Sequence, residues 1–259
     1  MSWLSKALDP TARPIEETSF PVDWRADLRA HGVSGIKGAF TAEQCRVWVE
    51  PIWSRHEELL AAIPEDAPAF ARSAAWGLDC APEPVTEVLA HPMLQEVAAD
   101  YFGTPDIRFA TWQAFARRRG AAATPWHHDG GFIPITGEQL AFWIPLTPSP
   151  TRSGLVALMD VEDGRGLRPL RQIDLDEGDL TFHDMHVVHR AEDVDADFLA
   201  LGLLVYPDGE TLMDAEDPRF QTQMDVFRER VFPGQRAGEP AVSALTPLLT
   251  EIAGSAPRH

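Results

Sequence analysis

The chain has 259 residues, of which 44% are hydrophobic and 24% charged, and this ordinary globular composition excludes wholesale disorder. Asp and Glu number 40 against 22 Lys and Arg, so that the formal charge is −18 and the isoelectric point is near 4.8. Such an acidic surface repels phosphate backbones and anionic lipids, and we expect neither a nucleic-acid nor a membrane partner. Only Lys6 and Lys37 could supply a lysine amine, so chemistry that needs one is nearly excluded.

The sequence carries the marks of a reduced, intracellular setting. Its two cysteines, Cys45 and Cys80, form no CxxC motif and cannot make a disulfide framework. The first residues lack the apolar core of a signal peptide, and no stretch approaches 18 uninterrupted apolar residues. We therefore expect a cytoplasmic protein.

The first part of the chain is predicted to be helical. Residues 1–24 contain scattered prolines without periodicity and are expected to be an irregular lead-in, followed by a helical flank over 25–105. One helix is predicted to begin after Thr41, because Thr41 and Gln44 form a capping box. A second is predicted over 92–103, from a proline suited to the first helical position to a terminating glycine.

The pattern changes to strands at about residue 106. The expected strands, short and rich in Val, Leu, Phe and Trp, are 106–117, 139–146, 154–161, 169–175, 179–183, 185–191 and 197–206. Strands of this spacing without intervening helices predict an antiparallel sandwich or barrel over 106–206. A C-terminal helical cap and tail over 207–259 complete a single predicted domain, 1–259, that is mainly β with flanking helices.

The strand region contains a candidate metal site. In an extended strand His127 and Asp129 point to the same face, whereas His128 points away. A histidine from a neighbouring strand, for which we choose His189, would complete two nitrogens and one carboxylate. Such a set leaves coordination positions open and suits Fe(II) that binds O2 and a reductant.

An HxD pair alone is a weak signal, because polar residues of a loop or of a hydrogen-bonded core give the same pattern. Two further histidines, His183 and His186, are predicted to be structural or to support the ligands.

Longer segments resemble the phytanoyl-CoA dioxygenase family of non-haem iron, 2-oxoglutarate-dependent oxygenases over about 27–207. The segments that carry the resemblance are DLRAHGVSGIKGAFTAEQC, HPMLQEVAADYFGTPDIRF, PWHHDGGF, QLAFWIPLTPSPTRSGLVAL, GDLTFHDMHVVHRA and FLALGLLVYP. The resemblance implies a double-stranded β-helix (jelly-roll or cupin-like) core with flanking helices. It also implies that the iron ligands are His127, Asp129 and His189.

The resemblance extends to residues around the co-substrate. Trp143 occupies a strand position that lines the 2-oxoglutarate pocket in relatives, and His128 replaces a glutamine frequently found between the two ligands. Gln113 and Trp112 alternate on the strand before the iron motif, so one of them should face the interior.

The usual anchor of the co-substrate is missing. Relatives hold the distal carboxylate of 2-oxoglutarate with an arginine about eleven residues after the distal histidine, where this chain has Ala200. An unpaired carboxylate in a partly dry pocket is costly, and a bidentate arginine is its natural partner. The candidate substitutes are Arg152, which we prefer, then Arg117, Arg119 and Arg72.

The sequence thus predicts an Fe(II)- and 2-oxoglutarate-dependent dioxygenase that uses O2 to hydroxylate an unactivated C–H bond of a small-molecule metabolite. The retained carboxylate at Asp129 argues against a halogenase. Two alternatives stay open: an iron oxygenase of the same fold whose substrate supplies the electrons, which Ala200 favours, and a non-catalytic relative that binds a metal or small ligand.

Overall fold

The computed structural model describes residues 16–18, 23–61, 74–77, 83–117, 119, 129, 135–148, 155–160, 167–173, 175–191 and 196–210. Of the predicted C-terminal cap and tail, residues 211–259 lie outside these residues.

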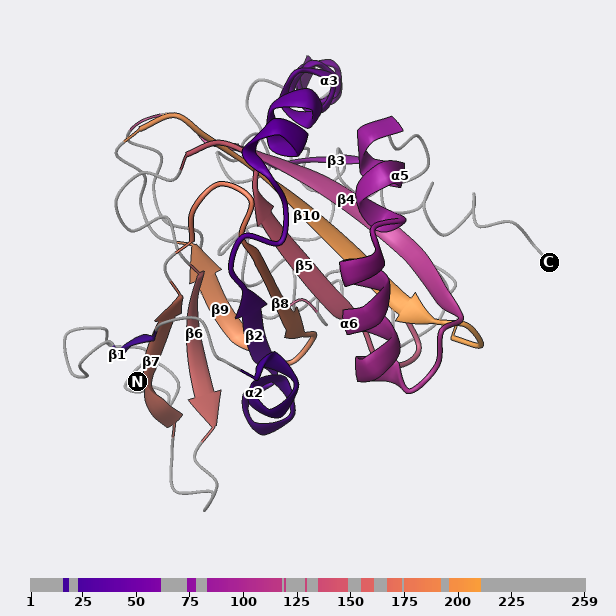
Figure 1. Cartoon of the computed structure of the whole chain (residues 1–259), viewed down its shortest axis with the longest axis vertical. Helices are drawn as coiled ribbons and strands as arrows, with labels where there is room; N and C mark the ends of the chain where they lie inside the picture. Colours follow the sequence, from indigo (N-terminus) through magenta and orange to yellow (C-terminus); the bar gives the residue numbers. More distant parts are fainter. Residues whose placement is uncertain are drawn as a thin grey trace, which may run out of the picture.

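Two β-sheets form the centre of the molecule (Figure 1). The six-stranded sheet has the order β2 (Val33–Ile36), β8 (Leu180–Asp184), β5 (Leu140–Pro145), β10 (Phe198–Pro207), β4 (Ile107–Arg117) and β3 (Ala74–Gly77). The four-stranded sheet has the order β1 (Glu16–Thr18), β7 (Leu167–Ile173), β6 (Leu155–Asp160) and β9 (Val188–Ala191). From β7 to β10 successive strands alternate between the two sheets, as in a double-stranded β-helix, and every described strand pair except β1–β7 is antiparallel.

The strands predicted over 106–206 are confirmed, since each corresponds to one of β4 to β10. The prediction for the N-terminal part is incomplete. Strand β1 lies in the segment predicted to be irregular, and β2 and β3 add a strand to each edge of the six-stranded sheet from within the predicted helical flank. These strands have three or four residues, too few for a period-two pattern to stand out in the sequence.

The described part of the chain has four helices, of which the sequence predicted the two that begin near residues 41 and 92. They are α2 (Trp24–His31), α3 (Ala42–Ala61), α5 (Glu83–Leu89) and α6 (Pro92–Phe102). The capping box of α3 is confirmed: the backbone N–H of Thr41 donates to Oε1 of Gln44 at 2.9 Å, and that of Gln44 donates to Oγ1 of Thr41 at 3.2 Å. Helix α6 begins at Pro92 behind an N-cap histidine and ends at Gly103. No helix among the described residues is long and apolar enough to cross a bilayer.

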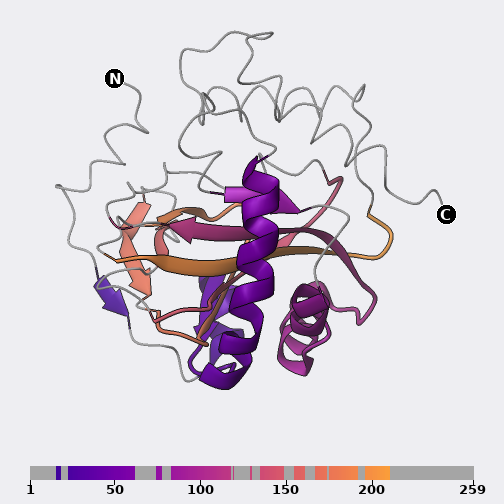
Figure 2. The same ribbon diagram turned by 90° about the horizontal axis from the view of Figure 1, so that it is seen from above.

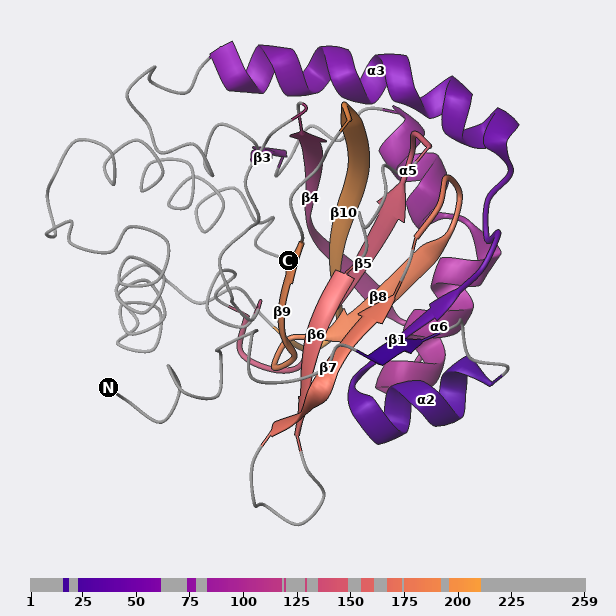
Figure 3. The same cartoon turned by 90° about the vertical axis from the view of Figure 1, so that its left-hand side faces the viewer.

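The helices cover one face of the six-stranded sheet. In Figure 1 α5 and α6 lie on the side of this sheet away from the four-stranded one, and Figures 2 and 3 show α3 running across the ends of β4 and β10. The main hydrophobic core lies between sheet and helices. Its largest buried members from the sheet are Trp112, Phe142, Phe182, Ile144, Leu140 and Leu180, and those from the helices are Trp48, Ile52 and Leu94.

Cys45 belongs to this core and is not a reactive thiol. Burial, with a smaller contribution from the negative charge of Glu177, raises the pKa of the Cys45 thiol to about 11. The side chain is therefore neutral near pH 7 and acts as a small apolar packing residue.

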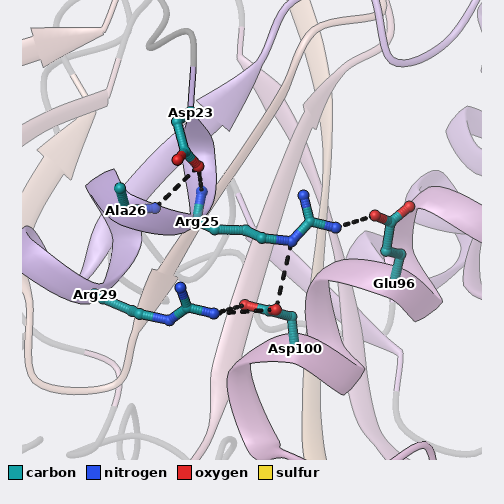
Figure 4. A network of polar contacts seen from close by, with 6 residues as sticks. All are labelled: Asp23, Arg25, Ala26, Arg29, Glu96 and Asp100. Carbon is teal, nitrogen blue, oxygen red and sulfur yellow. Dashed lines mark hydrogen bonds and ion pairs between the residues drawn. The ribbon is translucent and has the colours of Figure 1, made fainter.

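Ion pairs on the surface connect α2 to α6 (Figure 4). Arg25 pairs with Glu96 and with Asp100, and Arg29 pairs with Asp100 at 2.9 Å. Both arginines are substantially exposed, so each pair contributes little stability. The position of the two helices is set mainly by the apolar residues beneath them.

Gly178, just before β8, ties the sheet to the start of α3. Its backbone N–H donates to the carbonyl of Pro145, and its own carbonyl accepts from the N–H of Phe40. Gly178 has φ 82°, and a Cβ built on it would lie 2.2 Å from the carbonyl oxygen of Phe40. Any larger residue would meet both backbone strain and a clash with main chain that cannot move independently.

We therefore expect Gly178→Ala to lower the free energy of unfolding by about 2–5 kcal/mol, from strain and overpacking together. Urea denaturation followed by circular dichroism measures this loss. The matched control is Gly103→Ala, since Gly103 has φ 68° but no atom within 4 Å of its built Cβ. Equal losses in the two variants would contradict the clash.

Candidate metal centre

The face of the six-stranded sheet that points away from the helices carries the candidate site. Residues opposite one another on antiparallel strands share a face. A row across this inner face joins Gln113 on β4, Gly202 on β10, Trp143 on β5 and Thr181 on β8. Trp112, the neighbour of Gln113, is in the helix-covered core, so Gln113 is the member of this pair that faces inward.

Three side chains come together at the inner side of β8. Nε2 of His183 lies 2.9 Å from Oδ2 of Asp129, and Nε2 of His189 lies 3.9 Å from Oδ1 of the same carboxylate. The two imidazole rings are 4.1 Å apart between centroids. One potential ligand atom from each residue lies within 4.8 Å of the others, so this group could hold a metal ion.

The chemistry of these donors fits a divalent ion. Nδ1 of His189 is 2.9 Å from the carbonyl oxygen of Val187, which can only accept, so the ring proton is on Nδ1. Nε2 therefore carries the lone pair that a metal ligand needs, and the hydrogen bond to the backbone fixes the orientation of the ring. The 3.9 Å between Nε2 and Oδ1 of Asp129 leaves room for an ion about 2.0–2.2 Å from each atom.

Asp129 is partly exposed, whereas both histidines are buried. The side chain of Asp129 is 20% exposed, against 4% for His183 and 7% for His189. A metal ion bound here would be shielded from solvent by the two buried imidazoles. It would stay accessible on the side of Asp129, where a co-substrate could bind.

Two of the three predicted ligands, Asp129 and His189, are thus adjacent. The third, His127, lies outside the described residues, as do His128 and two candidate anchors, Arg152 and Arg72.

The structure adds His183 to the group. It comes from β8, in the six-stranded sheet, whereas His189 comes from β9, in the four-stranded sheet. Its contact with Asp129 spans 54 residues and could not be read from local spacing. The sequence held two hints that His183 belongs to the site: it lies in the same motif as His189, and it is two residues from Thr181 on β8, so that both side chains are on one face.

The predicted co-substrate residues line the same inner face. Trp143 is buried and its ring lies 4.3 Å from that of Phe115 between centroids. Gln113 and Thr181 flank Trp143 in the row described above, and within the described part of the chain neither Nε2 of Gln113 nor Oγ1 of Thr181 has a hydrogen-bond partner. Buried polar atoms are normally paired, so these two are suited to contact a bound polar molecule.

Arg117 and Ala200 lie beyond this row. Ala200 is opposite Phe115 and fully buried, and Arg117 is opposite Phe198 and 3% exposed. Arg119, by contrast, is exposed, and its backbone N–H donates to Asp197.

Fold and site define a double-stranded β-helix protein with a centre of carboxylate and imidazole groups suited to a metal ion. The family model described as phytanoyl-CoA dioxygenase (PhyH) matches residues 28–198. The chain therefore belongs to the phytanoyl-CoA dioxygenase family and is an oxidoreductase of the Fe(II)- and 2-oxoglutarate-dependent class.

Solved structures with the same fold share little sequence with this chain. The epimerase SnoN from nogalamycin biosynthesis is 18% identical, with a TM-score of 0.61 over 76% of this chain and 87% of its own. The carbocyclase SnoK from the same biosynthesis is 17% identical, with a TM-score of 0.63 over 78% and 91%. EvdO2 from Micromonospora carbonacea var. aurantiaca, complexed with 2-oxoglutarate, is 18% identical, with a TM-score of 0.54 over 79% and 98%. Among curated proteins, none matches this chain.

Proposed function

We propose that this chain is a dioxygenase that hydroxylates an unactivated C–H bond of a small molecule, using Fe(II), 2-oxoglutarate and O2. The observation that carries the proposal is the convergence of Asp129, His183 and His189 on the inner face of the β-helix. Membership of the family adds the co-substrate to this group.

We assign the metal ligands as His127, Asp129 and His189. For Asp129 the geometry supports a division between its two oxygens: Oδ1 faces Nε2 of His189, and Oδ2 accepts from Nε2 of His183. His183 then fixes the rotation of the carboxylate rather than binding the ion itself, as partners of ligating carboxylates commonly do.

Fe(II) held by these residues would activate O2, the oxidant: one oxygen atom would enter succinate as 2-oxoglutarate loses CO2, and the other would be inserted into the C–H bond of the substrate. The residues of the chain bind and orient the reactants. Trp143 offers an apolar wall, and the amide of Gln113 and the hydroxyl of Thr181 offer hydrogen bonds on either side of it.

The substrate class is a small molecule. SnoN is an epimerase and SnoK is a carbocyclase, so different reactions occur on this one fold. Hydroxylation is our choice for this chain, because it requires no second reacting group of the substrate beside the oxidised carbon. The acidic composition also disfavours substrates with a phosphate-rich carrier.

Anaerobic loading with Fe(II), followed by addition of 2-oxoglutarate, tests the proposal. A weak charge-transfer band in the visible region is expected for the wild-type protein, together with succinate formation once O2 and a pool of small metabolites are admitted. Iron binding without this band and without succinate would show that 2-oxoglutarate is not the co-substrate. Failure to bind iron would favour a non-catalytic relative.

A further inference from the structure

The position of the family's arginine on β10 is filled by a residue that cannot bind a carboxylate. Ala200 is fully buried and lies beside Trp143 and Phe198 in an apolar cluster of the inner face, with Phe115 packed against it. If 2-oxoglutarate binds here, as the proposed function requires, its distal carboxylate needs a cation from another strand.

Lysine does not provide this cation. Lys37 is 68% exposed and pairs with Asp179, and Lys6 lies outside the described residues. Among the arginines whose side chains the structure describes, Arg117 is the buried one. The others lie at the surface or, like Arg190, which directly follows the inward-facing His189, leave the opposite face of their strand.

The register places Arg117 next to Ala200. Arg117 is directly opposite Phe198 on β10, two residues before Ala200, and all three side chains are on the inner face. Diagonal neighbours on antiparallel strands are about 7–8 Å apart, a separation that long side chains bridge. The side chain of Arg117 is thus long enough to bring its guanidinium level with Ala200, the position at which relatives carry their arginine.

Gln113 and Phe115 lie on the same face of the same strand as Arg117. The order along β4 is therefore an amide level with Trp143, an aromatic ring over Gly202, and a buried guanidinium at the strand end. This order provides polar groups at two levels of the inner face with apolar surface between them.

We propose that Arg117 binds the distal carboxylate of 2-oxoglutarate, so that the anchor has moved from β10 to the adjacent strand β4. The proposal rests on the proposed function, because it concerns the same pocket. Arg117 also interacts with other residues of its own chain, and a purely structural role is the competing explanation that the experiment must separate.

The experiment compares two co-acids that differ only at the distal end. The Fe(II)-loaded protein is titrated without O2 with 2-oxoglutarate and with 2-oxopentanoate, which has a methyl group in place of the distal carboxylate. The dissociation constants are measured by calorimetry. Wild-type protein is expected to prefer 2-oxoglutarate by about 10- to 150-fold, the value of a charge-assisted hydrogen bond. Arg117→Met is expected to abolish this preference by weakening 2-oxoglutarate alone.

Arg119→Met is the matched control, because Arg119 is an exposed arginine two residues further on, and its preference should equal that of the wild type. Arg117→Lys keeps the charge but loses the bidentate fork, and an intermediate preference is expected. This variant serves as the test if Arg117→Met does not fold.

Any one of the following outcomes would overturn the proposal. A preference retained in Arg117→Met, or lost in Arg152→Met instead, would place the anchor elsewhere. Equal weakening of both co-acids would show that Arg117 is structural. Wild-type protein that binds neither co-acid would refute the proposed function as well, whereas equal binding of both would refute only the anchor.

Discussion

Replacement of His189 by alanine is expected to lower the affinity for Fe(II) by more than about 100-fold. This loss is larger than the loss expected when a residue that only hydrogen-bonds to a metal ligand is removed. Nδ1 of His189 is hydrogen-bonded to the carbonyl of Val187, so Nε2 is the nitrogen that can bind the metal, and it faces the carboxylate of Asp129. Without His189 the metal ion loses the imidazole ligand on this side of Asp129. Metal content after anaerobic loading and gel filtration, together with calorimetric titration, measures the loss.

His186→Ala is the control for this variant. His186 lies in the same motif, but it is exposed on the turn between β8 and β9, and its backbone N–H rather than its ring makes the bond to Asp184. Its removal should leave iron binding and the unfolding transition unchanged. Normal iron affinity in His189→Ala would exclude His189 as a ligand.

Replacement of His183 by alanine is expected to weaken Fe(II) binding by about 10- to 100-fold while one ion per chain still binds at saturation. The reason is that His183 donates to Oδ2 of Asp129, and loss of this bond lets the carboxylate rotate away from the ion. The accompanying prediction is that His127→Ala loses iron as completely as His189→Ala. Calorimetric titration of the three variants with Fe(II) under one set of anaerobic conditions gives affinity and stoichiometry together.

The opposite ranking would change the ligand assignment. If His183→Ala abolished iron binding and His127→Ala retained it, the ligands would be Asp129, His183 and His189, the group that the structure already brings together. His183→Gln sharpens the distinction, because an amide can still donate to Asp129 but is a poor substitute for an imidazole ligand. If His183→Gln binds Fe(II) more tightly than His183→Ala, His183 acts by holding the carboxylate of Asp129 and not as a metal ligand.

The fold could be predicted from the sequence because its strand region alternates clearly and its helices carry local stop and start signals. Thr41 and Gln44 satisfy each other within three residues, so that the beginning of α3 is a local property. Strands β1 and β2 pair with β7 and β8, more than a hundred residues further on, and nothing in their own residues specifies those partners.

The site was predictable in its residue types and less so in its contacts. Asp129 and His189 follow from the motif, but the bond between His183 and Asp129 depends on the placement of β8 beside a residue 54 positions away in the sequence. Arg117 is four residues after Gln113 on one strand, so the sequence alone could have shown that both side chains are on the same face of the sheet. Its position diagonal to Ala200 required the register between β4 and β10.

The alternation of faces on β4 has a consequence for how this enzyme can diversify. Trp112 and Ala114 are fixed by the packed core under the helices, whereas Gln113 and Arg117, between and beyond them, are on the inner face of the sheet. Substitutions at Gln113 and Arg117 can thus alter which acid or substrate is accepted while the core between the sheet and the helices stays packed. A combinatorial library restricted to Gln113 and Arg117 should therefore yield a higher proportion of folded proteins with altered selectivity than a library at Trp112 and Ala114.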